Sequence, residues 1–368
     1  MKKTIGLISA NYSNDTFGEL TTRRTLASLP FAGRYRIVDF PLSNMANAGI
    51  DTVGLITPHN ARSLLDHVGV GRPWGMDKKR GGLFVLPGAV YGMRTKTGKF
   101  LMRDLVKNGR FFYKDDADYV ILSGSSKIYN MDFKDLIEAH EKNGTPVTFA
   151  YTQLKEAAGY EGLFLTLKRN GKIKSATQKP TTGKANYFLD CMIVNREFLI
   201  NCTKWYEALD FMSLTEVIVD NLADIEVGTF LFRGYVGVVD NISDYMQVHR
   251  DVLQPSIAHE LFGAERKIFT RVQDSAPTLY KKGASVKSSL VATGCIIEGE
   301  VENSILFRDV TIKPGAVVKN SIVMQHTVIE AGAVIENVVC DKYSSLGSGM
   351  QLVGQPDQPL IVSKDQKF

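Results

Sequence analysis

The sequence predicts an α/β protein with two structural parts: a domain built on a mixed, mainly parallel β-sheet, followed by a left-handed parallel β-helix. Two observations lead to this fold class. Short apolar runs alternate with helical patterns up to about residue 240, and a six-residue apolar period begins at about residue 281. The length of 368 residues also exceeds the size of one typical domain of about 100–200 residues.

The composition is that of a globular protein, with 44% hydrophobic and 23% charged residues. No apolar run approaches the roughly 18 residues of a membrane span, so we expect no membrane partner. The net charge of +5 comes without a basic run or interleaved aromatic residues, so we expect no nucleic-acid partner. The four cysteines have no C-x-x-C spacing, which is typical of buried thiols in a reducing compartment; we expect a cytoplasmic protein.

The first domain shows four strand patterns, KTIGLIS, TVGLIT, YVILSG and TPVTFAY. Helical patterns lie between them in FPLSNMANAG, NARSLLDHVGVG and FKDLIEAHEKNG, with Gly49 and Gly144 as the stop signals of the first and the last. Strands that alternate with helices predict a mainly parallel sheet covered on both faces. Ligands of such sheets bind at the carboxyl ends of the strands, which places the loop around Ser125 at the expected site.

In the last part of the chain an apolar residue recurs every sixth position, with one threonine in the series: Ile305, Thr311, Val317, Val323, Ile329 and Ile335. This period fits neither a helix nor a single strand, and it is typical of a hexapeptide-repeat β-helix; a β-sandwich is the alternative. DNISDYMQVHRDVL predicts a helix between the parts. We therefore expect domains at residues 1–240 and 281–368, joined by a helical linker at 241–280.

One long motif, LPFAGRYRIVDFPLSNMANAGIDTVGLIT, resembles the P-F-G-G-K-Y-R-I-I-D-F-P-L-S-N motif of glucose-1-phosphate adenylyltransferases (ADP-glucose pyrophosphorylases). IYNMDF, QKP, GYVGVVDNISDY and the start of the repeats extend the resemblance over nearly the whole chain. It implies a Rossmann-like, GT-A-like nucleotidyltransferase domain. It also implies synthesis of ADP-glucose from ATP and glucose 1-phosphate, with Mg²⁺ held by carboxylates.

The positions that carry the reaction in this family are changed here. The family's glycine-rich loop after the first strand reads SANYSNDTFGEL, and the segment MRTKTGKFLMRDL does not match the family's nucleotide-contacting G-T-A-D-A. By resemblance, Leu26 stands where the family has a phosphate-binding lysine, while Ser126 and Tyr235 stand where it has the two metal-binding aspartates. Neither a serine nor a neutral phenol is a good Mg²⁺ ligand, so we expect no catalytic and no metal site.

Three basic residues remain as candidate binding or catalytic groups. By resemblance Lys179 matches a sugar-phosphate lysine and Arg34 a residue of an activator phosphate site between the domains. Each has a simpler interpretation: Lys179 as an exposed lysine in a turn, and Arg34 as a partner in an ordinary salt bridge. His326 is the only histidine of the repeat region and the natural general base of an acyltransferase, but a solvent-facing coil histidine is the simpler interpretation.

These losses at separate positions predict a chain that resembles the non-catalytic, GlgD-type subunits of this family. We expect a hetero-oligomer, a tetramer, with a catalytic homologue that it activates or modulates for glycogen biosynthesis, and a homo-oligomer when alone. A sugar phosphate or another anion is the expected effector, and Mg²⁺ is expected only in the catalytic partner. The alternatives are an active nucleotidyltransferase with a rearranged metal site, a sugar acyltransferase and a purely structural partner.

Overall fold

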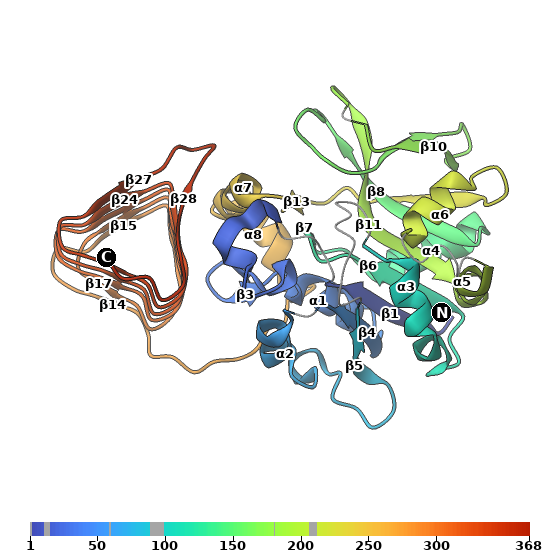
Figure 1. Ribbon diagram of the computed structural model, residues 1–368, viewed down its shortest axis with the longest axis horizontal. Helices are drawn as coiled ribbons and strands as arrows, with labels where there is room; N and C mark the ends of the chain where they lie inside the picture. Colours follow the sequence, from blue (N-terminus) through green and yellow to red (C-terminus); the bar gives the residue numbers. More distant parts are fainter. Residues whose placement is uncertain (1, 11–14, 59, 89–98, 180, 206–211) are drawn as a thin grey trace.

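The computed structural model describes residues 2–10, 15–58, 60–88, 99–179, 181–205 and 212–368. Figure 1 shows the α/β domain and the β-helix side by side, with two helices, α7 (Ile242–Val252) and α8 (Pro255–Phe262), between them. The N-terminus lies at the end of the α/β domain that is remote from the β-helix (Figure 1).

Within the described residues, nine strands form the central mixed sheet, in the order β10-β9-β11-β6-β1-β4-β5, with β8 on β11 and β12 on β8. Strands β5, β4, β1 and β6 pair in parallel, whereas β11 runs antiparallel to β6, β8 and β9. The strands are β1 (Thr4–Ser9), β4 (Thr52–Thr57), β5 (Gly82–Pro87), β6 (Tyr119–Ser123), β8 (Val147–Leu154), β9 (Phe164–Leu167), β10 (Ile173–Thr177), β11 (Ala185–Asn195) and β12 (Val227–Leu231).

The central strands are apolar because helices cover both faces of the sheet. Successive residues of a strand point to opposite faces, so Ile121 of β6 packs in one core cluster and Leu122 in the other. The covering helices are α1 (Asp39–Asn47), α2 (Arg62–Val68), α3 (Met102–Lys107), α4 (Phe133–Asn143), α5 (Arg196–Trp205) and α6 (Leu214–Asp220). The mixed sheet predicted from the sequence is confirmed.

Helix α4 illustrates how local sequence sets these elements. Asp132 accepts a hydrogen bond from the Lys134 backbone N–H at 2.9 Å and so caps the first turn. Gly144 ends the helix with φ 63°, a left-handed conformation that glycine adopts without a Cβ clash. Leu136 and Ile137 lie between these signals and pack on the sheet.

The β-helix consists of three parallel sheets, each of five short strands. Val301, Val318 and Ile335 stack on one another in successive coils, and each is 17 residues after the one before it. The strands are β14 (Leu279–Tyr280), β15 (Ser285–Lys287), β16 (Leu290–Val291), β17 (Ile296–Ile297), β18 (Glu300–Glu302), β19 (Ile305–Leu306), β20 (Thr311–Ile312), β21 (Val317–Lys319), β22 (Ile322–Val323), β23 (Val328–Ile329), β24 (Val334–Glu336), β25 (Val338–Cys340), β26 (Ser345–Leu346), β27 (Gln351–Val353) and β28 (Leu360–Val362).

The strict six-residue period expected from the sequence does not hold along the whole β-helix. Val323, Ile329 and Ile335 belong to its internal core, but earlier in the series the core residues are Leu306, Ile312 and Val318, one position later than expected. A coil of 17 residues is one short of three hexapeptides, so the inward position shifts by one along the chain. The fold class is confirmed, and only its period differs.

The linker is helical only in its first half. Helices α7 and α8 end at Phe262, and residues 263–278 run as an extended segment to the first strand of the β-helix (Figure 1). Among the residues that the structure describes, no helix is long and apolar enough to cross a membrane.

Candidate functional site

A cavity of about 760 Å³ opens at the carboxyl ends of β1 and β6, where the sequence placed the ligand site. Its lining includes Leu26, Ser126 and Lys179, which lie far apart in the sequence. The fold therefore brings together three of the residues singled out from the sequence. Tyr235, Arg34 and His326 are not among the lining residues.

Ser125 and Ser126 occupy the loop between β6 and the short strand β7 (Lys127–Ile128). The Ser125 hydroxyl donates to the Ser9 carbonyl oxygen at 2.8 Å, a bond that ties the loop to the end of β1. Ser126 faces the cavity, and its Oγ accepts a hydrogen bond from Lys99 Nζ at 2.8 Å. An ammonium group therefore lies beside the position where the resemblance placed a metal-binding aspartate.

Asp190 forms the centre of a charged cluster in the wall of the cavity. Its Oδ2 accepts hydrogen bonds from both Lys99 Nζ and Lys127 Nζ, and the three side chains are only 15%, 11% and 3% exposed. The Lys127 ammonium also lies 4.8 Å from the centre of the Tyr187 ring. Burial raises the pKa of Asp190, but the two ammonium groups outweigh burial and hold this pKa below its usual value.

The backbone at Asp190 is unusual for a strand. The register of β11 shifts between Phe188 and Cys191, which marks a β-bulge, and Asp190 has φ 52°. A positive φ costs a residue with a side chain about 1 kcal/mol or more, and such conformations concentrate at functional sites. The bulge turns Asp190 toward the cavity and places its carbonyl oxygen 2.8 Å from the Gly124 amide nitrogen, which donates to it.

Leu26 and Lys179 lie in the cavity wall with different surroundings. Leu26 is buried in a short 3-10 helix, η2 (Leu26–Ser28), and presents an apolar surface at the position where the resemblance placed a lysine of the family. Lys179 is exposed, and its backbone N–H donates to Thr177 Oγ1 at 3.2 Å. Lys179 is thus placed to touch a ligand, whereas Leu26 offers it no charge.

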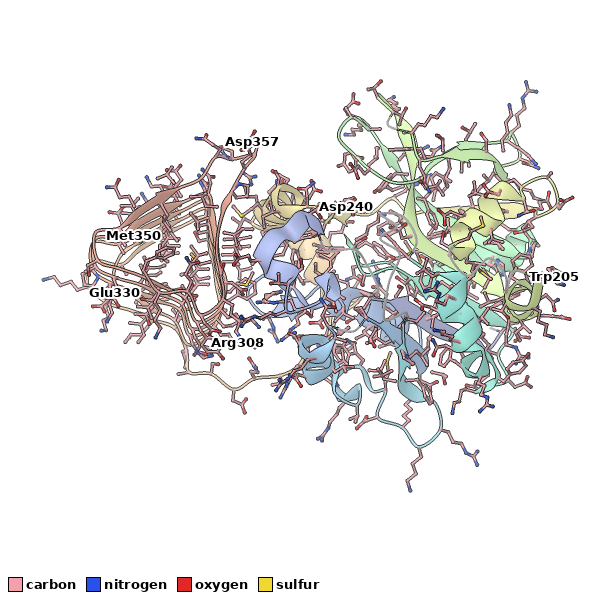
Figure 2. All side chains as sticks on the ribbon, in the orientation of Figure 1. Trp205, Asp240, Arg308, Glu330, Met350 and Asp357 are labelled. Atoms are coloured by element: carbon pink, nitrogen blue, oxygen red, sulfur yellow. The ribbon has the colours of Figure 1, made fainter. Side chains whose placement is uncertain are left out.

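Tyr235, which by resemblance replaces the second metal-binding aspartate, is not among the residues that line the cavity. Its hydroxyl donates to Asp251 Oδ2 of α7 at 2.7 Å, outside the main cavity. Burial and this hydrogen bond raise the pKa of Tyr235 well above its usual value, so the phenol stays neutral. The carboxylate that the cavity wall receives from this part of the chain is Asp240, which Figure 2 labels near α7.

Arg34 and a group of less exposed cations form separate features where the two domains meet. Arg34 is exposed, lies 5.3 Å from the Tyr35 ring centre and is near Arg308, which Figure 2 labels on the β-helix. Arg24, in contrast, forms a buried ion pair with Asp341 of the β-helix. The Nη1 of Arg24 is buried without a hydrogen-bond partner among the described residues.

Lys342 lies beside this ion pair on the β-helix. Burial, together with the nearby positive charges of Arg36 and Arg24, lowers the pKa of Lys342 to about 7. Burial likewise lowers the pKa of Arg36 to about 10. Mutually repelling cations of this kind are favourable surroundings for an anion, and they lie deeper between the domains than Arg34, the residue predicted for that role.

His326 lies at a corner of the β-helix with φ 60°, between Asp309 and Tyr343 of the neighbouring coils. Its ring stacks on Tyr343 at 4.8 Å, and its Nδ1 is 3.9 Å from Asp309 Oδ2. The side chain is 45% exposed. His326 therefore belongs to a row of side chains at one corner of successive coils.

Three residues of the cavity were not among the candidates predicted from the sequence: Lys99, Lys127 and Asp190. Lys127 lies in the same loop as Ser126, and the only available signal for Asp190 was a lone carboxylate inside the apolar run of β11. Lys99 lies within the segment MRTKTGKFLMRDL, which matches no family motif, so the sequence offered no signal for it.

Comparison with known proteins agrees with this architecture. The nucleotidyl transferase family model matches residues 17–247, and a model for the GlmU-like C-terminal hexapeptide domain matches residues 276–358. The first match covers more than half of the chain. The chain belongs to the nucleotidyl transferase family.

Relatives within this nucleotidyl transferase family carry two kinds of name. The glycogen biosynthesis protein GlgD of Bacillus subtilis is 32% identical over 98% of this chain and 95% of its own length. A glucose-1-phosphate adenylyltransferase of Halalkalibacterium halodurans is also 32% identical, over 100% of this chain and 97% of its own length. One from Thermotoga maritima is 30% identical over 86% of this chain. Overall identity therefore does not separate the two kinds of relative.

The Mg²⁺ implied by the resemblance does not fit the residues of the cavity. Among the described residues, no group of three or more His, Cys, Asp or Glu side chains is placed to hold a metal ion. Ser126 accepts from the Lys99 ammonium, and the Oδ2 of Asp190 accepts from two ammonium groups. A divalent cation beside Ser126 would meet the like charge of Lys99.

Proposed function

We propose that this chain is a non-catalytic subunit that supports ADP-glucose synthesis for glycogen by assembling with a catalytic glucose-1-phosphate adenylyltransferase. The relatives of both kinds support the glycogen role. The choice of a non-catalytic subunit rests on one observation: the Lys99 ammonium lies at Ser126, where the reaction would require a metal-binding carboxylate. Transfer to a phosphorus atom depends on neutralising charge with a metal ion in a fixed place.

The partner in this proposal is a homologous catalytic subunit, which alone carries Mg²⁺, and the assembly is a hetero-tetramer. Regulation requires that this chain bind the active and inactive states of the partner with different free energies. The buried Arg24 and the half-buried Arg36 and Lys342 are the proposed place for an anionic effector, because Arg24 Nη1 has no hydrogen-bond partner among the described residues.

One observation favours a second candidate function, an active nucleotidyltransferase with a rearranged metal site. Two carboxylates, Asp190 and Asp240, line the same cavity as Ser126. This alternative requires a cation to displace the lysines from Asp190, which would break two charge-assisted hydrogen bonds. It predicts ADP-glucose formation by this chain alone.

The deciding experiment measures ADP-glucose formation by the purified chain, by a purified catalytic homologue, and by the two mixed. The proposal expects no measurable activity from the chain alone. It also expects the mixture to exceed the catalytic subunit by several-fold, or to change its effector response, with co-elution of the two chains in size-exclusion chromatography.

The matched control is a catalytic partner that lacks its own metal-binding carboxylate. Its mixture with this chain must be inactive, because neither chain would then hold the metal ion. Activity in that control, or in this chain alone, supports the second candidate and contradicts the proposal. Co-elution without any change in rate or effector response would leave a structural role only.

A further inference from the structure

Lys342 lies in the turn between β25 and β26, beside the ion pair that joins the β-helix to the α/β domain. We propose that its side-chain amine is a covalent modification site, which dissolved CO₂ converts to a carbamate held by the guanidinium groups of Arg24 and Arg36. The inference goes beyond the proposed function, because it assigns a reversible chemical change to this chain rather than a bound effector or a partner.

The charged groups that act on Lys342 are three cations, Arg24, Arg36 and Lys364, and a single carboxylate, Asp341. Both oxygens of that carboxylate are already occupied. Its Oδ2 pairs with Arg24 Nη2, and its Oδ1 accepts from the Lys342 backbone N–H at 2.7 Å. The cluster therefore carries an excess of positive charge, and a new negative group beside Lys342 would be stabilised there.

One donor of this cluster lacks an acceptor. Arg24 is only 5% exposed, and its Nη1 is buried without a hydrogen-bond partner among the described residues. A buried N–H group without a partner is costly, whereas a guanidinium group and a carboxylate form strong, charge-assisted hydrogen bonds. A carboxylate formed on the Lys342 amine would supply an acceptor where this donor needs one.

The Lys342 amine itself suits this reaction. Within the part of the chain that the structure describes, its Nζ makes neither an ion pair nor a hydrogen bond. Burial, together with the charges of Arg36 and Arg24, lowers the pKa of Lys342 to about 7, so the amine is largely uncharged at pH about 7.5. A desolvated lysine amine beside other cations is an activated nucleophile.

The reaction balances with CO₂ as its only co-reactant. The lone pair of the neutral Nζ forms a bond to the carbon of CO₂, and the electron pair of one C=O π bond moves to oxygen. The nitrogen then releases one proton to solvent, which leaves an N-carboxylate with one negative charge. Uptake of a proton and release of CO₂ reverse the step, so the charge of this turn would respond to both CO₂ and pH.

Chemical trapping on the full-length chain tests this inference. The folded chain is incubated with ¹³C-labelled bicarbonate as the source of CO₂ at pH about 7.5, and triethyloxonium then converts any carbamate to a stable ethyl ester. Peptide mass spectrometry should find the labelled ester on Lys342. The exposed Lys142 should carry at least about tenfold less, because its hydrogen bond to Glu138 raises its pKa and keeps the amine protonated.

A variant of the cationic cluster tests the role of the guanidinium groups. Arg36 belongs to β3 (Tyr35–Arg36), and Arg36→Met removes one cation beside Lys342. The labelled fraction at Lys342 should fall about tenfold, the effect of one lost charge-assisted interaction or of one unit of pKa. Arg72→Met, at an exposed arginine of the 3-10 helix η3 (Arg72–Trp74), is the matched control and should be labelled as the parent chain is.

Thermal unfolding adds a second measurement that does not depend on Arg36→Met being folded. Bicarbonate should raise the unfolding temperature of the parent chain above its value in an equal concentration of chloride, because the reaction is selective for the folded state. Lys342→Met, which removes one cation from a crowded group, should lose this increase.

A folded chain without label on Lys342 would overturn the inference, as would equal labelling of Lys142 or of the chain unfolded in urea. Unchanged labelling in folded Arg36→Met, or an equal bicarbonate effect in Lys342→Met, would overturn it as well. None of these measurements uses a partner subunit or ADP-glucose. The carbamate and the partner role therefore fail or succeed separately.

Discussion

His249 of α7 is held in one neutral tautomer by two backbone groups. Its Nδ1–H donates to the Tyr245 carbonyl oxygen at 2.8 Å, and its Nε2 accepts from the Ala32 N–H at 3.3 Å. The ring is buried against Phe31 at 4.7 Å and Tyr245 at 4.4 Å. A proton on Nε2 would remove the acceptor, and burial lowers the pKa of His249 to about 4.

This depressed pKa predicts a loss of stability in mild acid. An unfolded histidine has a pKa of about 6.5, so below that pH the unfolded state binds a proton that the folded state excludes until pH 4. The neutral His249 ring contributes about 3 kcal/mol to the free energy of unfolding above pH about 6.5, and this stabilisation is lost as the pH falls to about 4. Replacing His249 by Gln should flatten the pH dependence of the unfolding free energy in that window.

Urea unfolding at several pH values provides the measurement, and the difference between variant and parent removes the effect of other titrating groups. His259→Gln, at an exposed histidine of α8, is the matched control and should leave the pH dependence unchanged. An equal pH dependence in His249→Gln and the parent chain would contradict this account of His249.

Individual site residues differed in how far the sequence could predict them. Ser126 was predictable because a loop at the end of a buried strand in an α/β sheet is a ligand position. Asp190 was not, because its side chain reaches the cavity through a bulge that changes the alternation of β11. The pairing of Lys99 with Asp190 joins groups 91 positions apart, and no local pattern encodes such a contact.

At the scale of elements, local signals determined most of the α/β domain. The apolar strand runs, the Asp132 cap and the Gly144 stop all act over a few residues, and the structure confirms the helices and strands that they predicted. The period of the β-helix was harder to predict, because its register depends on stacking between coils. Val301 pairs with Val318 across 17 residues, and a six-residue pattern cannot report that offset.

The corners of the β-helix carry a ladder of asparagines that predicts a stability effect. Asn303, Asn320 and Asn337 have φ of 47°, 46° and 53°, and Asn337 Nδ2 also donates to the Gly354 carbonyl oxygen at 3.1 Å. Asn337→Ala should cost about 2–3 kcal/mol, from the strained backbone together with the buried carbonyl left without its donor. Urea unfolding followed by circular dichroism would measure this cost.

Two further variants separate the contributions of the backbone and the hydrogen bond. Asn337→Gly removes the hydrogen bond but accepts the positive φ, so it should cost about 1 kcal/mol less than Asn337→Ala. Asn320→Ala, one coil earlier at a less buried position, should also cost less than Asn337→Ala. An alanine variant of Asn337 as stable as its glycine variant would contradict the assigned backbone strain.

At the scale of the whole molecule, the two domains share a core. One cluster of buried apolar side chains includes Phe31 and Phe40 of the first domain, Tyr245 of α7, and Phe307 and Met324 of the β-helix. Leu26, which lines the cavity, belongs to the same cluster. The β-helix and the cavity wall are therefore joined by continuous side-chain packing, which is the kind of connection that the proposed regulatory role would use.

Arg24 and Asp341 are the charged link in this interface and give the prediction for the molecule as a whole. Arg24 lies two residues before Leu26, and its ion pair with Asp341 is buried, with side chains 7% and 1% exposed. Arg24→Ala would leave the Asp341 carboxylate buried without its partner, which costs about 3–5 kcal/mol. Arg24→Met combined with Asp341→Asn removes both charges and should recover most of that loss.

The unfolding temperature and the rate of protease cleavage in the extended segment 263–278 together measure this link. Arg24→Ala should lower the unfolding temperature and expose the segment to cleavage, because the domains lose one of the buried contacts between them. The matched control is Lys142→Ala, which breaks the exposed pair of Lys142 with Glu138 and should cost less than about 1 kcal/mol. If Arg24→Ala behaved like that control, the buried pair would not couple the β-helix to the cavity.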